Sequence, residues 1–276
     1  MLLSEASHQY RNDVIIFGNQ SKKTEENHLV TMNNLIAYQG DIDIRNLTFD
    51  RVRDWKLDLD KGRSAETVRN YIIKLRVVLA YLQKRGIACL DPDSIPVPKR
   101  KDKVPQFLHK DQIAYIIDQT GSIRARAIVS LLYASGIRSS ELCSLNKEDI
   151  HDDSFTVVGK GGKARLCFID DRANLYLKMY LSTRDDHNPA LFVASTKRRI
   201  TNSNVQEIFR NLQKKTGIPI HAHTLRHSFA TNLLKNNANM RYVQVLLGHS
   251  SLETTQMYTH VVDEDLRKIY SDTHTI

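Results

Sequence analysis

A proline-rich, basic stretch interrupts the chain at residues 91–107, DPDSIPVPKRKDKVPQF, which hold four of the six prolines. Proline lacks a backbone donor, and it disfavours helix in the residue before it. No helical pattern can run through this stretch, and a chain of 276 residues is long enough for two domains. We predict a first domain of residues 1–92, a linker of residues 93–106 and a second domain of residues 107–276.

Helical periodicity dominates the first domain. Residues 65–84 carry apolar side chains at a spacing of three and four, with Ser64 placed to cap the start and Gly86 the end. The apolar positions are Val68, Tyr71, Ile72, Leu75, Val78, Leu79 and Leu82. Residues 26–40 and 48–59 suggest two further helices, so the first domain is predicted to be small and all-helical.

The second domain has the pattern of a mainly helical protein with one small antiparallel sheet. Two β-rich runs flank a glycine-rich turn in SFTVVGKGGKARLCFI, residues 154–169, which predicts a hairpin. Helical patterns occur near residues 109–119, 123–135, 171–182, 202–215, 224–236 and 240–247.

The charge of the chain favours a polyanionic partner. Lysine and arginine outnumber aspartate and glutamate by 40 to 31, which gives a formal charge of +9 and a pI near 9.4. Such an excess of positive charge favours nucleic acid as the partner, although a basic pI can also serve solubility alone. In the linker Lys99, Arg100, Lys101 and Lys103 would suit a strap along phosphates, and a merely solvated linker is the alternative.

The cysteines and the termini indicate a soluble, cytoplasmic protein. Cys89, Cys143 and Cys167 lie far apart and form no CxxC pair, so neither a disulfide framework nor a thiolate zinc site is expected. The first residues lack the pattern of a signal peptide, and no apolar run approaches the roughly 18 residues of a membrane span.

Cationic side chains gather at two positions of the second domain. Arg138 follows the helix-ending Gly136, and Glu141 could hold its guanidinium, although a surface pair across one helical turn is the alternative. In AHTLRHSFAT, His223 and Arg226 lie on the first turn of a helix, so both are expected to project from its exposed side. The core-facing residues of that helix would be Leu225, Phe229, Ala230, Leu233 and Leu234.

These residue types match the needs of phosphodiester cleavage. The reaction concentrates negative charge on phosphate oxygens, which arginine and histidine can stabilise. It also needs a nucleophile and an acid for the departing sugar oxygen. Lys160 lies at the hairpin turn, His249 follows the helix-ending Gly248, and Tyr258 stands among polar neighbours instead of core residues.

Zinc binding is the alternative role for the histidines. His223 and His227 have the spacing of a zinc pair, and His221 adds a third nitrogen. The intervening residues are Thr-Leu-Arg, which supply no glutamate and place a cation beside the site. We therefore predict no metal.

The succession Arg138, Lys160, His223-x-x-Arg226, His249 and Tyr258 resembles the tyrosine recombinase (phage integrase) family. The segments SGIRSSEL, GKGGKAR, HTLRHSFAT, LLGHSS and TTQMYTH are similar to that family's motifs, most of all to those of its Xer members. SAETVRNY and the helix after it are similar to the family's helical, SAM-like core-binding domain, which implies a two-domain clamp on DNA.

The resemblance implies a role for each of these residues. Tyr258 would be the nucleophile that forms a 3′-phosphotyrosyl link, while Arg138, Arg226 and His223 would hold the scissile phosphate with support from His249. Lys160 would be the general acid, with Lys163 as the alternative. His227 matches the family's motif but is expected to act as a packing residue. No cofactor is expected, because the phosphotyrosyl bond conserves the energy needed for religation.

The resemblance also implies the partners and the rival functions. Double-stranded DNA would be bound by a homotetramer on two duplexes, joined through a C-terminal tail in which Leu266, Ile269 and Tyr270 share one face. Chromosome-dimer resolution fits the Xer resemblance, and the absence of an arm-binding domain before residue 20 favours it over integration of a mobile element. A topoisomerase with the same tyrosine chemistry is a further rival function, and so is a noncatalytic DNA-binding module.

Overall fold

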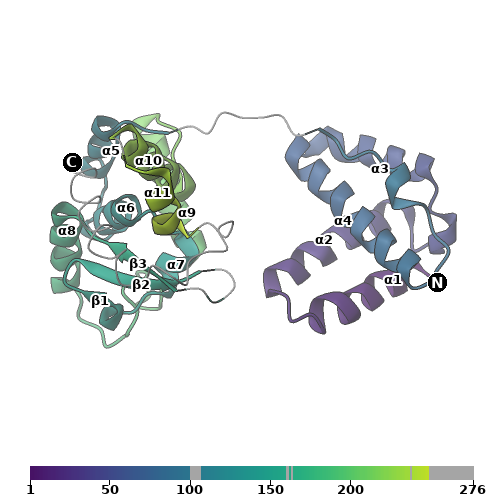
Figure 1. Cartoon of the computed structure of the whole chain (residues 1–276), viewed down its shortest axis with the longest axis horizontal. Coiled ribbons are helices and arrows are strands. Elements are labelled where there is room, and N and C mark those ends of the chain that lie inside the picture. The colour runs from purple at the N-terminus through teal and green to yellow at the C-terminus, as the bar shows by residue number, and fades with distance from the viewer. Residues whose placement is uncertain (100–106, 160–161, 163, 237, 249–276) are drawn as a thin grey trace. The chain divides into compact units, whose positions relative to one another are not determined.

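The computed structural model describes residues 1–99, 107–159, 162, 164–236 and 238–248. The chain forms two compact units that divide between residues 103 and 104 (Figure 1). Each unit has its own apolar core. Among the described residues, no helix has both the length and the apolar character needed to cross a membrane.

The first unit is helical, as predicted. Its helices are α1 (Leu3–Tyr10), a π-helical segment (Arg11–Ile16), α2 (Lys22–Gln39), α3 (Phe49–Gly62) and α4 (Ala65–Lys84). All seven apolar positions predicted for α4 are buried, and the Ser64 side chain accepts a hydrogen bond from the Thr67 amide at its start. The sequence analysis missed α1, because its 8 residues are too few to display a helical period.

The proline-rich segment begins packed against the first unit. A 3-10 turn spans Pro92–Ser94, and the Ile95 side chain is buried in the core of this unit. Two arginines of α4 bind the backbone that follows, Arg76 Nη1 at 3.0 Å from Ile95 O and Arg69 Nε at 3.1 Å from Pro98 O. The chain is thus held to α4 as far as Pro98.

Helix α6 (Ile123–Ser135) lies at the centre of the second unit, between α8 (Asp171–Ser182) and α10 (Ala222–Lys235) (Figure 1). Ten of its thirteen residues are buried, because it is covered on several sides. The remaining α-helices in the described part of this unit are α5 (Lys110–Asp118), α7 (Ser139–Ser144), α9 (Asn202–Thr216) and α11 (Met240–Leu247). The six helices predicted for this unit are confirmed as α5, α6, α8, α9, α10 and α11, whereas the short α7 was not predicted.

One small antiparallel sheet completes the second unit, as the sequence predicts. Strands β2 (Ser154–Val158) and β3 (Ala164–Phe168) form the hairpin, and the two-residue β1 (Ile150–His151) pairs with the other edge of β2. The register places Phe155 opposite Cys167 and Val157 opposite Arg165. All four side chains are buried, so an arginine occupies a core-facing strand position.

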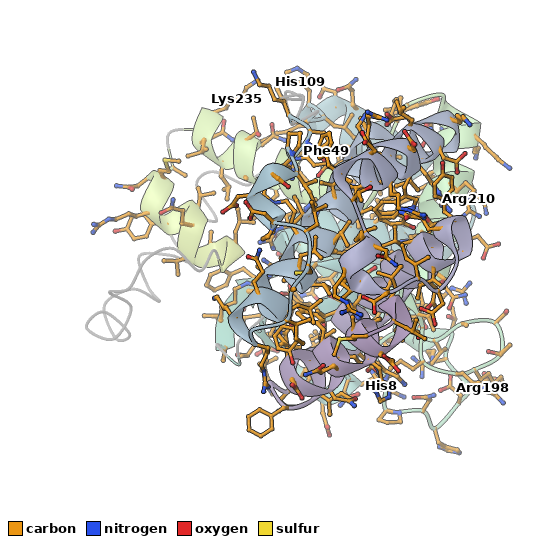
Figure 2. All side chains as sticks on the ribbon, turned by 90° about the vertical axis from the view of Figure 1, so that its right-hand side faces the viewer. His8, Phe49, His109, Arg198, Arg210 and Lys235 are labelled. Atoms are coloured by element: carbon orange, nitrogen blue, oxygen red, sulfur yellow. The ribbon has the colours of Figure 1, made fainter. Side chains whose placement is uncertain are left out.

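Helix α10 is fixed to the chain where that chain enters the second unit. The Leu108 amide donates to Ser228 Oγ at 2.8 Å, and Asn232 Nδ2 donates to Leu108 O at 3.3 Å. The Lys235 ammonium lies 4.3 Å from the centre of the Phe107 ring, and the His109 ring lies 5.2 Å from the same ring; Lys235 and His109 are labelled in Figure 2. These contacts along α10 hold in place the helix that carries His223 and Arg226.

Candidate active site

Arg138 is positioned by the turn between α6 and α7. Gly136 ends α6 with a φ of +61°, a conformation that suits glycine, and Arg138 is the residue that caps the start of α7. The Glu141 carboxylate reaches back from the first turn of α7 and accepts from the Arg138 amide and from Arg138 Nη1, both at 2.8 Å. The side chain of Arg138 remains 35% exposed.

The predicted contact between Arg138 and Glu141 is therefore confirmed, and the alternative of a surface pair is wrong. The Glu141 side chain is only 6% exposed. An exposed pair of this spacing contributes little, whereas a buried carboxylate must be fully hydrogen-bonded. Glu141 is held by a second arginine that the sequence analysis did not single out.

That second arginine is Arg165, which enters from β3. Arg165 Nη1 lies 3.0 Å from Glu141 Oε1, and Arg165 Nη2 lies 2.7 Å from Oε2, so the pair is bidentate. Its Nε donates to Leu246 O, at the end of α11, at 3.0 Å. The signal that could have found it is the strand alternation, which places Arg165 on the same buried face as Cys167.

The two arginines keep Glu141 ionised. Burial alone would raise the pKa of Glu141, but hydrogen bonds from Arg165 and Arg138, together with the positive charge of Arg165, lower it to about 2. The carboxylate is therefore a permanent negative charge at neutral pH.

Arg226 is buried, which corrects the expectation that it projects from an exposed side of α10. It is 4% exposed, with Nη1 at 2.6 Å from Gly136 O and Nη2 at 2.5 Å from Leu247 O. The carbonyl ends of α6 and α11 both point at it, and a guanidinium complements such ends. Burial lowers the pKa of Arg226 to about 10, with help from the charges of Arg138 and Arg165. It stays protonated at neutral pH.

His223 is exposed on the first turn of α10, as predicted. Loss of water on its protein-facing side lowers its pKa, and electrostatic interactions with its neighbours, among them Arg226 and Arg138, lower it further. The His227 ring stands edge-on to it at 5.3 Å. The structure therefore brings Arg138, Arg226 and His223 together. On the same helix Leu225, Phe229 and Leu233 are buried as predicted, but Leu234 is exposed.

The other predicted site residues, Lys160 with its alternative Lys163, His249 and Tyr258, lie outside the described residues. The basic linker residues Arg100, Lys101 and Lys103 do too, whereas Lys99 is described and exposed. The elements that lead to them are in place. Strands β2 and β3 flank the hairpin turn, and Gly248 follows the last residue of α11, whose carbonyl binds Arg226.

The third histidine of the zinc alternative, His221, serves the backbone. It caps the start of α10 by accepting the Thr224 amide on Nδ1 at 2.9 Å. Within the described ranges, no three histidine, cysteine or carboxylate side chains are placed to share a metal ion.

The far end of α7 is held as firmly as its start. Arg199 Nη1 donates to Ser144 O and Leu145 O at 2.9 Å each and to Cys143 O at 3.2 Å. These are carbonyls that the helix itself leaves unpaired. The sequence analysis did not identify Arg199, because a capping arginine 55 residues from its helix has no local signal.

Taken together, these groups form a cationic cluster. Arg138, Arg165 and Arg226 carry three positive charges against the one negative charge of Glu141. His223 adds a nitrogen beside them, and its lowered pKa favours the neutral imidazole, which has a nitrogen that can accept a proton. Fixed arginines with a net positive charge suit a phosphate whose oxygens gain negative charge during a reaction.

Comparison with known proteins identifies the class to which this fold and cluster belong. The phage integrase family matches residues 100–265, which is more than half of the chain. Tyrosine recombinase XerD of Oceanobacillus iheyensis is 34% identical over 278 residues, 92% of this chain and 93% of that protein. Tyrosine recombinase XerC of Alcanivorax borkumensis is 36% identical over 231 residues, 78% of this chain and 75% of that protein.

The chain therefore belongs to the phage integrase family. Within that family it is a tyrosine recombinase, with the Xer proteins among its relatives.

Solved structures show the same fold at low sequence identity. A lambda integrase (75-356) dimer bound to a COC' core site gives a TM-score of 0.76 at 18% identity, over 91% of this chain and 96% of that one. The Tn1549 transposon integrase in complex with circular intermediate DNA gives 0.75 at 20% identity, over 91% and 93%. The fold of this chain, helices with one small sheet, is thus similar to the folds of these two integrases.

Gly136 is expected to tolerate no side chain. A Cβ there would lie 2.5 Å from the buried Phe229 ring, and φ is +61°. We expect Gly136→Ala to lower the free energy of unfolding by about 3 kcal/mol, from the left-handed backbone and the overpacking together. Gly217→Ala is the matched control, because its φ is +71° and no atom lies within 4 Å of the added Cβ. Urea unfolding followed by circular dichroism should give about 1 kcal/mol for the control; equal losses would contradict the packing argument.

Glu141 should make stability depend on pH in the acid range. Its pKa is lowered from 4.5 to about 2 on folding. The stabilisation is present above pH 4.5 and is lost as the pH falls through 2, because protonation removes the charge that the arginines bind. We expect Glu141→Gln to be less stable than the parent by on the order of 3 kcal/mol at pH 7. In urea unfolding from pH 7 to pH 2 that gap should close, and a constant gap would rule out the ion pairs as its cause.

Proposed function

We propose that this tyrosine recombinase cleaves and rejoins double-stranded DNA at specific sites, with Tyr258 as the nucleophile. Attack on the scissile phosphate would form a 3′-phosphotyrosyl link and free a 5′-hydroxyl. The observation that carries the proposal is the cluster of Arg138, Arg226 and His223, in which both arginines lie close enough to His223 to lower its pKa and Arg138 lies close enough to Arg226 to lower that of its guanidinium. A phosphate is the DNA group that such a cluster would bind.

The two arginines would serve the phosphate in different ways. Arg138 has an exposed edge and would bind phosphate oxygens directly. Arg226 donates two bonds to neutral backbone carbonyls, so its positive charge is not cancelled. Removal of such an arginine should slow cleavage by on the order of 10³, by analogy with other phosphoryl transfers.

Protons would be handled by the remaining residues. Tyrosine has an ordinary pKa near 10, so the attack at neutral pH needs nearby cations or a histidine that accepts its proton. His223 fits that task, because its lowered pKa leaves it neutral. His249 would support the phosphate, and Lys160, or Lys163 in the same turn, would protonate the leaving 5′ oxygen. No cofactor would be required, because the phosphotyrosyl bond conserves the energy for religation.

The domains would divide the work of holding DNA. Residues 1–92, with the segment as far as Pro98 that packs on them, would form the helical core-binding domain, the rest of residues 93–106 the linker and residues 107–276 the catalytic domain, each of the two domains contacting phosphates. The tail would join protomers into a homotetramer on two duplexes. The lambda integrase tetramer bound to a Holliday junction, which has a TM-score of 0.76 with this chain, is an assembly of that kind.

The biological reaction that fits best is chromosome-dimer resolution in the cytoplasm. The relatives named XerD and XerC support it. Integration of a mobile element is the second candidate, and it is favoured by the similar fold of the Tn1549 transposon integrase. A topoisomerase would use the same chemistry on one strand without exchange between sites.

Covalent trapping tests the chemistry. The parent chain, incubated with nicked and labelled duplexes that carry candidate sites, should yield an adduct on the 3′ side of the break that resists denaturation. Tyr258→Phe should yield none, because the nucleophilic oxygen is absent. Tyr115→Phe, at an exposed tyrosine of α5, is the matched control and should still form the adduct.

Two outcomes would redirect the proposal. Tight, salt-sensitive DNA binding without an adduct would indicate a noncatalytic DNA-binding module. With an adduct, strand exchange between two sites should be compared with supercoil relaxation. Relaxation without recombinants on any site would favour the topoisomerase.

The tail proposal has its own test. Deletion of residues 263–276 should abolish complexes that contain two duplexes, while binding to one duplex persists, because only contacts between protomers are removed. Native gel electrophoresis measures both. Leu266→Ala should weaken pairing and Asp265→Ala should not, since only Leu266 belongs to the apolar face. Normal pairing by the deleted chain would show that the tail does not join protomers.

A further inference from the structure

Arg165 is a buried arginine that contacts the candidate active site, yet the proposed reaction assigns it no role. Its side chain is 7% exposed, so it is far less accessible to DNA than Arg138. Yet it binds two parts of the site at once, the Glu141 carboxylate and the carbonyl end of α11. Burying an arginine costs free energy unless its charge and donors are matched, so this placement calls for a physical reason.

The hydrogen bonds on Glu141 give the first part of that reason. Oε1 accepts from Nη1 of Arg165 and from Nη1 of Arg138, and Oε2 accepts from Nη2 of Arg165 and the amide of Arg138. A carboxylate offers about four acceptor positions. Each arginine therefore takes half of them, and the carboxylate is held in one orientation.

Charge gives the second part. With Arg138 alone, Glu141 would form a neutral pair and cancel the charge meant for phosphate. Arg165 supplies the compensating charge, so the trio of Arg138, Glu141 and Arg165 keeps a net charge of +1. The neighbouring Cys167 cannot compensate in its place, because burial raises the pKa of its thiol to about 12 and keeps it neutral.

The backbone at the end of α11 gives the third part. Gly248 follows α11 in a left-handed conformation, with φ of +63°, and a Cβ there would lie 2.9 Å from Arg165 Cδ. The side chain of Arg165 thus lies directly against this turn. His249 is the next residue in the sequence.

We propose that Arg165 is a positioning residue for the cleavage reaction: it offsets the charge of Glu141 so that Arg138 stays cationic toward phosphate, and it fixes the turn that precedes His249. The inference rests on the proposed function. It assigns Arg165 no contact with DNA, so its removal should slow the chemical step and leave DNA affinity unchanged.

The first test separates chemistry from binding. Under single-turnover conditions on a saturating nicked duplex, Arg165→Gln should cleave about 10²-fold more slowly than the parent, comparable to loss of one oxyanion donor. Its dissociation constant for DNA should stay within about threefold, because the scissile phosphate is one of many phosphates that a DNA-bound protein contacts. Arg165→Lys, which keeps the charge, should fall between the two in cleavage rate.

Charge compensation predicts a rescue that a merely structural role does not. Glu141→Gln in the Arg165→Gln background removes the uncompensated negative charge while its amide oxygen can still accept from Arg138. The double variant should recover about tenfold in cleavage rate over the single variant, the scale of one well-placed charge interaction. A double variant that is slower than the single one would overturn the inference.

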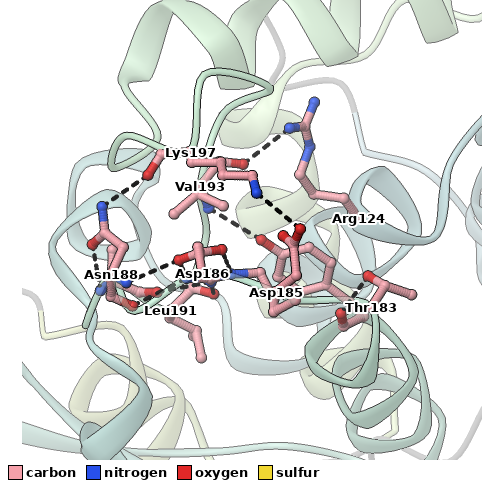
Figure 3. A network of polar contacts seen from close by, with 11 residues as sticks. Arg124, Thr183, Asp185, Asp186, Asn188, Leu191, Val193 and Lys197 are labelled. Carbon is pink, nitrogen blue, oxygen red and sulfur yellow. Dashed lines mark hydrogen bonds and ion pairs between the residues drawn. The ribbon is translucent and has the colours of Figure 1, made fainter.

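Arg184 provides the matched structural control. Its side chain is 5% exposed and pairs with Asp186, which is 9% exposed, through both carboxylate oxygens. It also donates to backbone carbonyls, and its partners Asp186, Asn188 and Leu191 are seen in Figure 3. Arg184→Gln should lower the melting temperature at least as much as Arg165→Gln, yet leave the cleavage rate of the folded protein near that of the parent. Equal losses of cleavage rate in the two variants would make Arg165 structural only.

A measurement without cleavage keeps this inference separate from the proposed function. Inorganic phosphate, followed by ³¹P line broadening, should bind Arg165→Gln more weakly than the parent and regain affinity in the double variant with Glu141→Gln. If the parent formed no adduct with DNA, the proposed function would fail while the phosphate titration would still decide the role of Arg165. Unchanged phosphate affinity in Arg165→Gln would overturn it.

Discussion

The Glu141 carboxylate, shared between Arg138 and Arg165, is the interaction on which the site depends. Its four hydrogen bonds join the start of α7 to strand β3, two segments 24 residues apart in the chain. Because burial would otherwise protonate the group, the two arginines and the carboxylate hold one another in their charged forms. Any element that shifts relative to the others therefore breaks an ion pair at the site.

Helix ends supply the second kind of support. Arg226 is bound by carbonyls at the ends of α6 and α11, and Arg165 by another carbonyl of α11. Such carbonyls carry partial negative charge and lack partners within their own helix. They satisfy a guanidinium without cancelling its charge, which a carboxylate cannot do. The backbone at residue 136 must lie close to the Phe229 ring in this geometry. Glycine allows this approach, whereas the Cβ of any other residue would collide with Phe229.

Local patterns in the sequence predict the helices, the hairpin and the contact between Arg138 and Glu141, since each depends on residues within a few positions. The burial of Arg226 could not be read in the same way. Its acceptors lie 90 residues before it and 21 after it in the sequence. The pattern of its own helix shows only that Arg226 is polar and lies on the same side as His223, and it gives no sign of these distant acceptors. The burial of Arg165 could have been predicted from the sequence. An arginine two residues from a buried cysteine on a strand faces the same side, and a buried arginine indicates an ion pair inside the fold.

The number of carboxylates in the cluster explains its electrostatic balance. Without Glu141, the guanidiniums would repel one another in a partly buried setting, where unit charges about 4 Å apart interact by about 4 kcal/mol at an effective dielectric constant of 20. With a second carboxylate the cluster would approach neutrality and lose its attraction for phosphate. One carboxylate among three arginines relieves the repulsion and leaves a net charge of +2. The pKa of Arg226 is lowered mostly by burial and in part by the charges of Arg138 and Arg165, so some repulsion among the guanidiniums persists. A bound phosphate would relieve this repulsion, so the repulsion among these cations itself favours the binding of a DNA phosphate.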